Sequence, residues 1–478
     1  MKMNSIKKNF IYNSIYQLLV IAMPLITTPY ISRVLGANGI GVYSYSYSVS
    51  QYYVLFIMLG LNNYGNRTIA SIRNDKKLLK ENFWSIYFMQ LFLGISVSLI
   101  YFIYCFSIAR NTFAALIMSI YVISACFDIN WFLFGMEMFK ATVIRNTLIK
   151  VLTTACIFIF VRNAEDVYTY CLIMVMGIFL SQIALWPYIK KIVPFYFPSF
   201  SEIKVHIKPN LVLFLTVIAV SLYKIMDKIM LGMLSNTSQV GFYESAERII
   251  LIPTSLITSL GTVMLPRMTN MFATEKNSDK TKNLLYKSIV LAAFLSSSMA
   301  AGIMGVSKEF IPIFYGSGYE ECINLFLILL PSCFFLGFGN VLRTQYLIPK
   351  KLDKIYVTSA FFGAVTNLIV NSLLIPKYFA VGAAVGTLLS EIVVCVYQSY
   401  MIRKKVELGK YIFTTVPFLV SSVVMFLIIY NFNSSDIRII GLLFLKIVIG
   451  VLIYIITLLL QAFIYTRIRK ISIKELIH

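Results

Sequence analysis

Long runs of apolar residues alternate with short polar connections along the whole chain. A helix that crosses a lipid bilayer needs about 20 mostly apolar residues, and about fourteen runs in this sequence reach that length. The first seven predicted spans cover residues 10–32, 40–63, 83–107, 113–135, 143–161, 167–189 and 210–233. The other seven cover residues 241–266, 285–306, 322–342, 355–375, 379–401, 411–431 and 438–462. The pattern predicts an all-α polytopic membrane protein.

The Lys and Arg residues predict how the chain is oriented, because basic residues beside a span stay on the cytoplasmic side. Thirty-two of them lie in the terminal segments and in every second connection, whereas six lie in the other connections. Both termini are therefore expected in the cytoplasm. The formal net charge of +22 is spread over eight such patches. This spread favours a topology signal and attraction to anionic membrane lipids over nucleic-acid binding.

The residues that carry most enzymatic and metal chemistry are scarce inside the spans. The only histidines, His206 and His478, fall on the predicted cytoplasmic side, and the seven cysteines lie in or beside spans without CxxC spacing. The connections are too short to form a catalytic domain outside the membrane. The sequence therefore predicts no enzyme, no metal site and no bound cofactor, and places the work of the protein inside the membrane.

An internal repeat appears when the chain is compared with itself at an offset of 200 residues. Gly41 then aligns with Gly241, and Tyr43 aligns with Tyr243. Each copy joins the first two helices of a set of six, so both sets have the same orientation and are related by an axis along the membrane normal. We expect two six-helix lobes, residues 1–200 and 201–405, followed by two extra helices and a cytoplasmic tail in residues 406–478. Two lobes suggest alternating access to a site near the midplane.

The first span contains two prolines, Pro24 and Pro29. A proline inside a helix removes one backbone hydrogen bond and kinks the helix. One interpretation is a bending helix that gates a cavity, with hinge or gate residues Pro24, Pro29, Gly36, Gly41 and Gly241. The other interpretation is a set of packing kinks, which neighbouring helices tolerate in a membrane.

Ionisable residues cluster in the seventh and eighth predicted spans, where each costs on the order of 2.5 to 3.5 kcal/mol to insert. Residues at positions i, i+3 and i+4 share one helix face. The seventh span contributes Lys224, Asp227 and Lys228, and the eighth contributes Glu244, Glu247 and Arg248. One interpretation is a cationic site for an anionic headgroup, formed by Lys224, Lys228 and Arg248, with a carboxylate that couples transport to an ion. The other is a neutral paired network that stabilises the second lobe.

Two further charged residues are candidates in the first lobe. Asp128 lies in the fourth span without a basic residue on its own helix, and desolvation favours the protonated form of such a buried acid. It is therefore a candidate for proton coupling, or else a neutral acid hydrogen-bonded to a neighbouring helix. Arg33 lies where the first span meets its outward loop. It is a candidate for phosphate recognition or an ordinary interfacial anchor.

Three stretches of the sequence resemble one transporter family. Residues 27–43 (TTPYISRVLGANGIGVY) resemble the start of Wzx-type polysaccharide-unit flippases, a branch of the multidrug/oligosaccharidyl-lipid/polysaccharide exporter superfamily. Residues 227–232 (DKIMLG) with Val240-Gly241-Phe242-Tyr243, and Phe314-Tyr315-Gly316, look like the corresponding parts of the second lobe. The resemblance covers nearly the whole chain.

This resemblance implies a transport function. It implies movement of an undecaprenyl-diphosphate-linked oligosaccharide from the inner to the outer leaflet of the bacterial plasma membrane, driven by a proton or sodium gradient, for O-antigen or capsule assembly. A polysaccharide polymerase and chain-length machinery are the partners that it implies. Two alternatives remain: a multidrug or cation antiporter of the same superfamily, and a membrane-embedded glycan polymerase or ligase.

Overall fold

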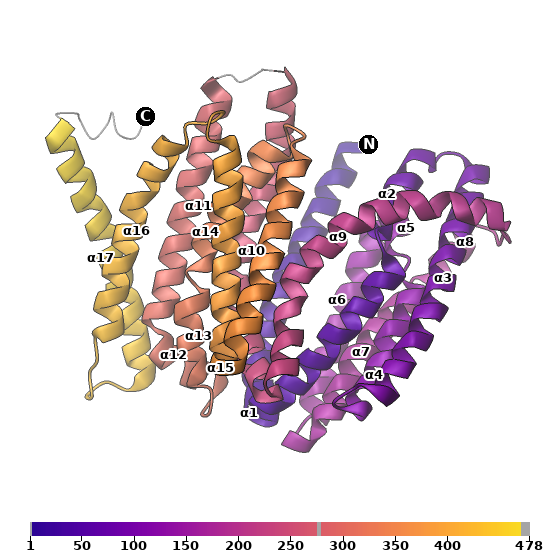
Figure 1. Ribbon diagram of the computed structural model, residues 1–478, viewed down its shortest axis with the longest axis horizontal. Coiled ribbons are helices and arrows are strands. Elements are labelled where there is room, and N and C mark those ends of the chain that lie inside the picture. The colour runs from indigo at the N-terminus through magenta and orange to yellow at the C-terminus, as the bar shows by residue number, and fades with distance from the viewer. Residues whose placement is uncertain (1, 275–278, 470–478) are drawn as a thin grey trace. The chain divides into compact units, whose positions relative to one another are not determined.

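The computed structural model describes residues 2–274 and 279–469. Within these ranges it describes side chains from residue 23 to 466, except those of residues 139, 191, 216, 219, 220 and 222–224. The described residues form helices and no strands (Figure 1). By contacts between Cα atoms they divide into two compact units, Met1–Gly241 and Phe242–His478.

The first unit contains nine α-helices, two short 3₁₀ helices and the start of the next helix. The α-helices are α1 Lys2–Met58, α2 Leu61–Ile72, α3 Lys76–Ser107, α4 Thr112–Ser124, α5 Asn130–Gly135, α6 Phe139–Phe160, α7 Val167–Ile183, α8 Trp186–Ile192 and α9 Phe200–Leu234. The 3₁₀ helices are η1 Ala125–Phe127 and η2 Ala164–Asp166, and α10 (Thr237–Thr274) crosses into the second unit.

The second unit contains the rest of α10, seven further α-helices and one π-helix. The α-helices are α11 Asp279–Gly305, α12 Ser307–Tyr315, α13 Glu321–Leu329, α14 Ser332–Leu342, α15 Asp353–Ile402, α16 Leu408–Asn431 and α17 Ile439–Arg469. The π-helix η3 covers Arg343–Leu347 and directly continues α14.

Two of the long helices are each two spans joined by a sharp backbone turn. In α1 the turn lies at Gly36 (φ 64°, ψ −179°), and in α15 it lies at Phe379 (φ 50°, ψ −128°). As one straight rod, the 57 residues of α1 would reach about 85 Å, well over twice the thickness of the hydrocarbon core, about 30 Å. Each turn therefore sends the chain back across the membrane.

The helices match the predicted spans. By length and composition, ten helical segments of the described chain are able to cross a membrane. They correspond to eleven predicted spans, because α15 contains two, and the other three predicted spans lie in α1 and α9. The all-α polytopic class with about fourteen spans is confirmed.

The compact units divide at Gly241, whereas the predicted lobes divide near residue 200. The difference arises because α9 packs against α1, α2 and α3 of the first unit. The lobe boundaries at residues 200 and 405 follow the sequence repeat, and they stay a prediction.

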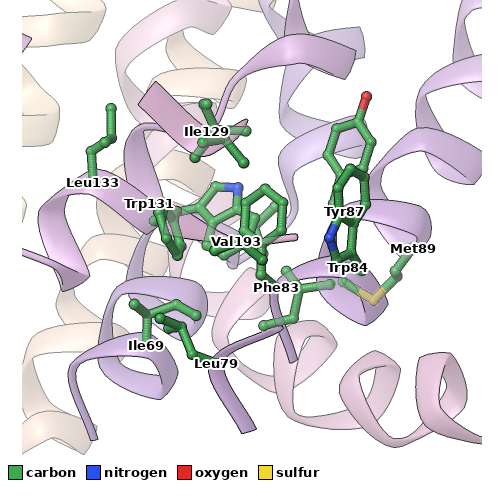
Figure 2. Close-up of a cluster of buried hydrophobic side chains, with 14 of the residues drawn as sticks. Ile69, Leu79, Phe83, Trp84, Tyr87, Met89, Ile129, Trp131, Leu133 and Val193 are labelled. Atoms are coloured by element: carbon green, nitrogen blue, oxygen red, sulfur yellow. The ribbon is translucent and has the colours of Figure 1, made fainter. Parts of the chain in front are cut away.

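Buried side chains from α2, α3, α5 and α8 form a hydrophobic core of the first unit, and Phe83, Trp84 and Trp131 are among its aromatic members (Figure 2). At its centre the Phe83 ring lies 5.6 Å from the Trp131 ring and 4.8 Å from the Phe132 ring. A Cβ atom at Gly65 of α2 would lie 2.6 Å from the Trp131 ring, so a glycine is needed for α2 to approach this closely. The cluster fixes α5, the short second half of the fourth span.

The first part of α9 carries a buried histidine. The helix starts with a capping box between Ser199 and Glu202, and His206 lies before the predicted span of residues 210–233. The Tyr64 hydroxyl and His206 Nδ1 are 2.7 Å apart. Burial lowers the pKa of His206, because the charged imidazolium is costly away from water.

We predict that acid destabilises the protein through His206. Because its pKa is lower in the folded than in the unfolded state, the unfolded chain binds the extra proton first. The resulting stability is present above the unfolded pKa of about 6.5 and is lost as the pH falls towards the folded value. Thermal unfolding of the purified full-length chain from pH 7.5 to 5.5 measures this. His206→Gln should flatten the profile, and an equally steep profile in that variant would contradict the assignment.

Candidate functional site

The fourth span is interrupted at Asp128. There α4 ends at Ser124, η1 adds one short turn, and Asp128 is extended (ψ 105°) before α5 begins at Asn130. The break frees backbone carbonyl groups, which lipid cannot satisfy.

Side chains from neighbouring helices satisfy these carbonyl groups. The Gln90 amide of α3 donates to the Ala125 and Asp128 carbonyls at 2.6 and 2.9 Å, and it accepts from Trp131 Nε1 at 3.0 Å. The Trp186 indole donates to the Phe127 carbonyl at 3.1 Å. The break is thus stabilised by specific side chains of the first unit.

The Asp128 side chain lies in a polar cluster that the break creates. Its Oδ1 accepts from the backbone N–H and the side-chain amide of Asn130 at 2.9 and 2.7 Å. The Asn130 amide also donates to Gln182 of α7 at 3.2 Å, and Asn130 Oδ1 accepts from Arg145 of α6 at 3.1 Å. We call Gln90, Asp128, Asn130, Arg145 and Gln182 the span-4 polar cluster. Within it, a carboxyl group and a guanidinium both bind Asn130.

Sequence reasoning missed Arg145. The pattern of basic residues groups Arg145 with the cytoplasmic patches, although it lies inside the predicted span of residues 143–161. Its guanidinium donates to the Ser181 carbonyl at 2.9 Å and to the Asn146 side chain at 2.6 Å. Asp128 therefore has a basic neighbour from another helix, although its own helix provides none. A site of this composition changes its net charge when a proton binds, which is the property that ion coupling requires.

The predicted cationic residues of the seventh span belong to α9. The side chain of Lys224 lies outside the side chains that the structure describes. Lys228 is half-buried, whereas Asp227 is buried.

In α10, Arg248 forms an ion pair with Glu244 (2.9 Å, one turn apart), and Glu247 is half-buried beside them. Asp227 and Lys228 lie in the first compact unit, whereas Arg248 lies in the second. Their predicted joint site stays a prediction.

Arg33 is exposed, and its guanidinium donates to the Pro29 carbonyl of the same helix at 2.7 Å. This bond suits an interfacial anchor, and the role of Arg33 in phosphate recognition stays a prediction.

The predicted hinge residues of α1 divide into two kinds. Pro24 and Pro29 lie inside the helix and are half-buried, while Gly36 forms its sharp turn. The positive φ of Gly36 favours glycine, because a side chain adopts this conformation at a cost. Whether Pro24 and Pro29 bend during transport stays a prediction.

Gly41 and Gly241 lie at a close contact between the turn after Gly36 and the start of α10. A Cβ atom at Gly41 would overlap the Thr237 carbonyl, and a Cβ atom at Gly241 would overlap the Ala37 carbonyl. These positions are related by the 200-residue repeat, so the contact is nearly two-fold symmetric. The hydroxyl of Thr237 also bonds the Asn38 side chain. All six residues belong to the first compact unit.

A buried ion pair in the second unit was also missed. Lys446 of α17 is fully buried, and its Nζ lies 2.7 Å from Glu309 of α12. The acid is far away in sequence, in a connection between predicted spans, so no helical spacing links the two. Among the described residues, no group of three His, Cys, Asp or Glu side chains is arranged to hold a metal ion.

Comparisons with known proteins find sequences that are named for polysaccharide biosynthesis and glycan transport. The family model described as "Polysaccharide biosynthesis protein" matches residues 6–272. The chain is similar to a putative O-antigen transporter of Escherichia coli K12, with 23% identity over 409 residues that cover 83% of this chain and 96% of that protein. It is also similar to the probable low-salt glycan biosynthesis flippase Agl15 of Haloferax volcanii, with 26% identity over 257 residues and 53% of each chain.

Two solved structures share its fold. The lipid II flippase MurJ in an inward closed conformation has a TM-score of 0.73 at 15% identity, over 96% of this chain and 99% of that one. An inward-facing multidrug resistance MATE transporter has a TM-score of 0.61 at 16% identity, over 81% and 99%. At these identities the likeness concerns the fold alone.

We predict that Asp128→Asn leaves folding intact and impairs gradient-driven transport. Asparagine keeps an oxygen that accepts the Asn130 hydrogen bonds but removes the titratable group. A lost coupling free energy of the usual size lowers transport about 5- to 150-fold. Transport assays with equal protein levels measure this, and Asp128→Leu, which also loses the acceptor, serves as the destabilised comparison. Normal transport by Asp128→Asn would show that the carboxyl group is structural.

We predict that Gly41→Ala or Gly241→Ala separates the turn after Gly36 from the start of α10. The added Cβ atom meets backbone, which moves at a cost of about 1–3 kcal/mol. Cysteines at positions 38 and 237 should cross-link readily with glycine at both sites and poorly in either alanine variant. The control is Gly409→Ala, where a Cβ atom meets no atom within 4 Å. Equal cross-linking in all variants would rule out the close contact.

Proposed function

The chain belongs to the polysaccharide biosynthesis protein family, and we propose that it is a flippase for a polyprenyl-diphosphate-linked oligosaccharide. The family match, which covers more than half of the chain, carries this proposal. The substrate moves from the inner to the outer leaflet of the plasma membrane for assembly of a surface polysaccharide, O-antigen or capsule. The names of the similar proteins, an O-antigen transporter and a glycan flippase, support the same kind of cargo.

The chemistry of this cargo fits the charged residues of the spans. A diphosphate carries negative charge across the membrane and needs cationic partners at the midplane. Lys224, Lys228, Arg248 and Arg33 are our candidates for this role. Arg248 already pairs with Glu244 at 2.9 Å, so a diphosphate that binds Arg248 has to compete with this carboxylate.

Ion-coupled alternating access is the mechanism that we propose. The span-4 polar cluster contains a carboxyl group inside the membrane, and its interrupted helix is typical of ion sites in transporters. A proton or sodium gradient then drives the cycle through Asp128, with Asp227, Glu244 and Glu247 as further candidates. We place both termini in the cytoplasm and expect the polysaccharide polymerase and chain-length machinery as partners.

Detection of the lipid-linked oligosaccharide in each leaflet tests the function. Cells that lack the chain should accumulate complete units facing the cytoplasm, and an impermeant enzyme added outside intact cells should release no sugar from them. Re-expression should restore the outer-leaflet signal. An unchanged surface glycan together with altered sensitivity to cationic drugs would overturn the proposal and favour a drug antiporter.

We predict that Lys224→Gln or Lys228→Gln impairs transport while membrane insertion stays normal. Loss of one charge-assisted hydrogen bond costs about 1.5–3 kcal/mol, so the half-saturating substrate level should rise about tenfold or more. The matched control is Lys282→Gln, which removes an exposed lysine that pairs with Asp279 at 3.6 Å. Wild-type transport by both span variants would remove these lysines from the site.

A further inference from the structure

The connection between α8 and α9 exposes three phenylalanines that lie outside the candidate sites described above. Residues 193–199 link the two helices, and Phe200 is the first residue of α9. The side chains of Phe195, Phe197 and Phe200 are 69%, 73% and 76% exposed. All three lie outside the predicted spans, and the orientation predicted from the basic residues places them on the cytoplasmic side. Exposed apolar groups that lie together mark a surface that something else covers.

Contacts with α3 hold this connection in place. The Trp84 indole donates to the Pro194 carbonyl at 2.8 Å, and the Trp84 ring lies 4.7 Å from the Phe195 ring. One turn farther along α3, the Phe88 ring lies 5.2 Å from the Phe197 ring. The exposure of these phenylalanines is therefore set by the packing of the first unit.

The same contacts join the phenylalanines to the face of α3 that meets lipid. Three exposed apolar residues follow Phe88 at positions i+4, i+7 and i+11, namely Phe92, Ile95 and Leu99. Residues at this spacing share one face of a helix. Because α3 is long and apolar enough to cross a membrane, its exposed apolar face lies against acyl chains. Through the contact of Phe88 with Phe197, the connection continues this face towards the cytoplasm.

Two lysines share the face of α9 on which Phe200 lies. Lys204 and Lys208 follow Phe200 at positions i+4 and i+8, and both are exposed. Residues four apart are neighbours on a helix surface, so the apolar ring and the two charges are presented together. The surrounding segments 73–81 and 186–208 contain eight basic and three acidic residues. An anionic surface therefore complements this end of the first unit.

The acid nearest to the phenylalanines in the sequence has a structural role. Glu202 accepts from the Ser199 N–H at 2.6 Å and from the Tyr196 hydroxyl at 2.8 Å. The first bond belongs to the capping box that starts α9. Lys80 of α3 adds a positive charge on the other side of Tyr196, with its Nζ 4.9 Å from the centre of the ring. The connection thus combines exposed rings with nearby positive charge.

We propose that residues 195–208 form an interfacial anchor that inserts into the cytoplasmic leaflet of the bilayer and binds anionic phospholipid. The three phenylalanines enter the boundary between headgroups and acyl chains, and Lys204 and Lys208 bind the headgroup phosphates. Continuity with the lipid-facing side of α3 and the excess of positive charge favour the bilayer over a protein partner. The anchor depends on the membrane class of the protein and not on its cargo.

Fluorescence quenching in nanodiscs tests the insertion of the phenylalanines. The purified full-length chain carries Phe197→Trp, and the emission of the wild-type chain is subtracted to remove the native tryptophans. Phospholipids brominated on the acyl chains near the headgroup should quench most of the added emission, whereas iodide in the buffer should quench little of it. The matched control is Asn74→Trp, at an exposed position between α2 and α3 on the same predicted side, where iodide should be the stronger quencher.

Two outcomes of this measurement would overturn the anchor. If iodide quenches the indole at position 197 and the brominated lipid does not, the phenylalanines face water in the purified chain and are left for a soluble protein partner. If neither quencher reaches this indole, the phenylalanines are covered by another part of the chain or by a second copy.

Thermal unfolding tests the contacts with the headgroups. Stepwise replacement of phosphatidylcholine by phosphatidylglycerol should raise the unfolding temperature of the wild-type chain more than that of the double variant Lys204→Gln, Lys208→Gln. The control Lys282→Gln removes an exposed lysine of the second unit and should keep the wild-type shift. An equal shift in all three proteins would contradict binding of anionic lipid at this place. Neither readout needs transport, so a chain that is anchored here but moves no glycan lipid contradicts only the proposed function.

Discussion

The absence of water from the hydrocarbon core is the constraint on which this structure depends. Every backbone group freed from a helix there must find a partner in the protein. At the break near Asp128 the partners are Gln90 and Trp186, which come from two other helices of the first unit. An interruption of a span thus requires polar side chains nearby. Beside the satisfied backbone, Asn130 binds both the Asp128 carboxyl group and the Arg145 guanidinium.

The same constraint applies to charges, and the two compact units meet it in different ways. In the second unit, Lys446 and Glu309 pair directly at 2.7 Å and join α17 to α12. A buried pair of this kind gains little net stability, but removal of one partner is costly, so it fixes which helices pack together. In the first unit, Asp128 and Arg145 are connected through Asn130. Asn130 therefore links α5 to α6 and holds the acid and the guanidinium in one hydrogen-bonded cluster.

The sequence predicts the spans well because hydropathy and length act locally. The repeat aligns Gly41 with Gly241 in the loop between the first two helices of each set, whereas a gating role for these glycines stays a prediction. Contacts between different helices are harder to predict, because residues far apart in the sequence have no regular spacing that would reveal the contact. The basic-residue pattern groups Arg145 with the topology signals, and Glu309 lies in a connection between predicted spans. Its partner Lys446 is 137 residues away in the chain, so no spacing links the two residues. The sequence therefore predicts candidate residues from their chemical type, whereas only the packed structure shows which residues surround them.

The contact between Gly41 and Gly241 has an evolutionary consequence. A contact in which Gly41 meets Thr237 and Gly241 meets Ala37 has the pattern of an isologous interface, in which one surface patch binds its own copy. Each glycine faces backbone of the other copy of the repeat, so a side chain at either position disturbs the same contact. Selection therefore acts on both positions together although they lie 200 residues apart, while the rest of the two copies is free to diverge.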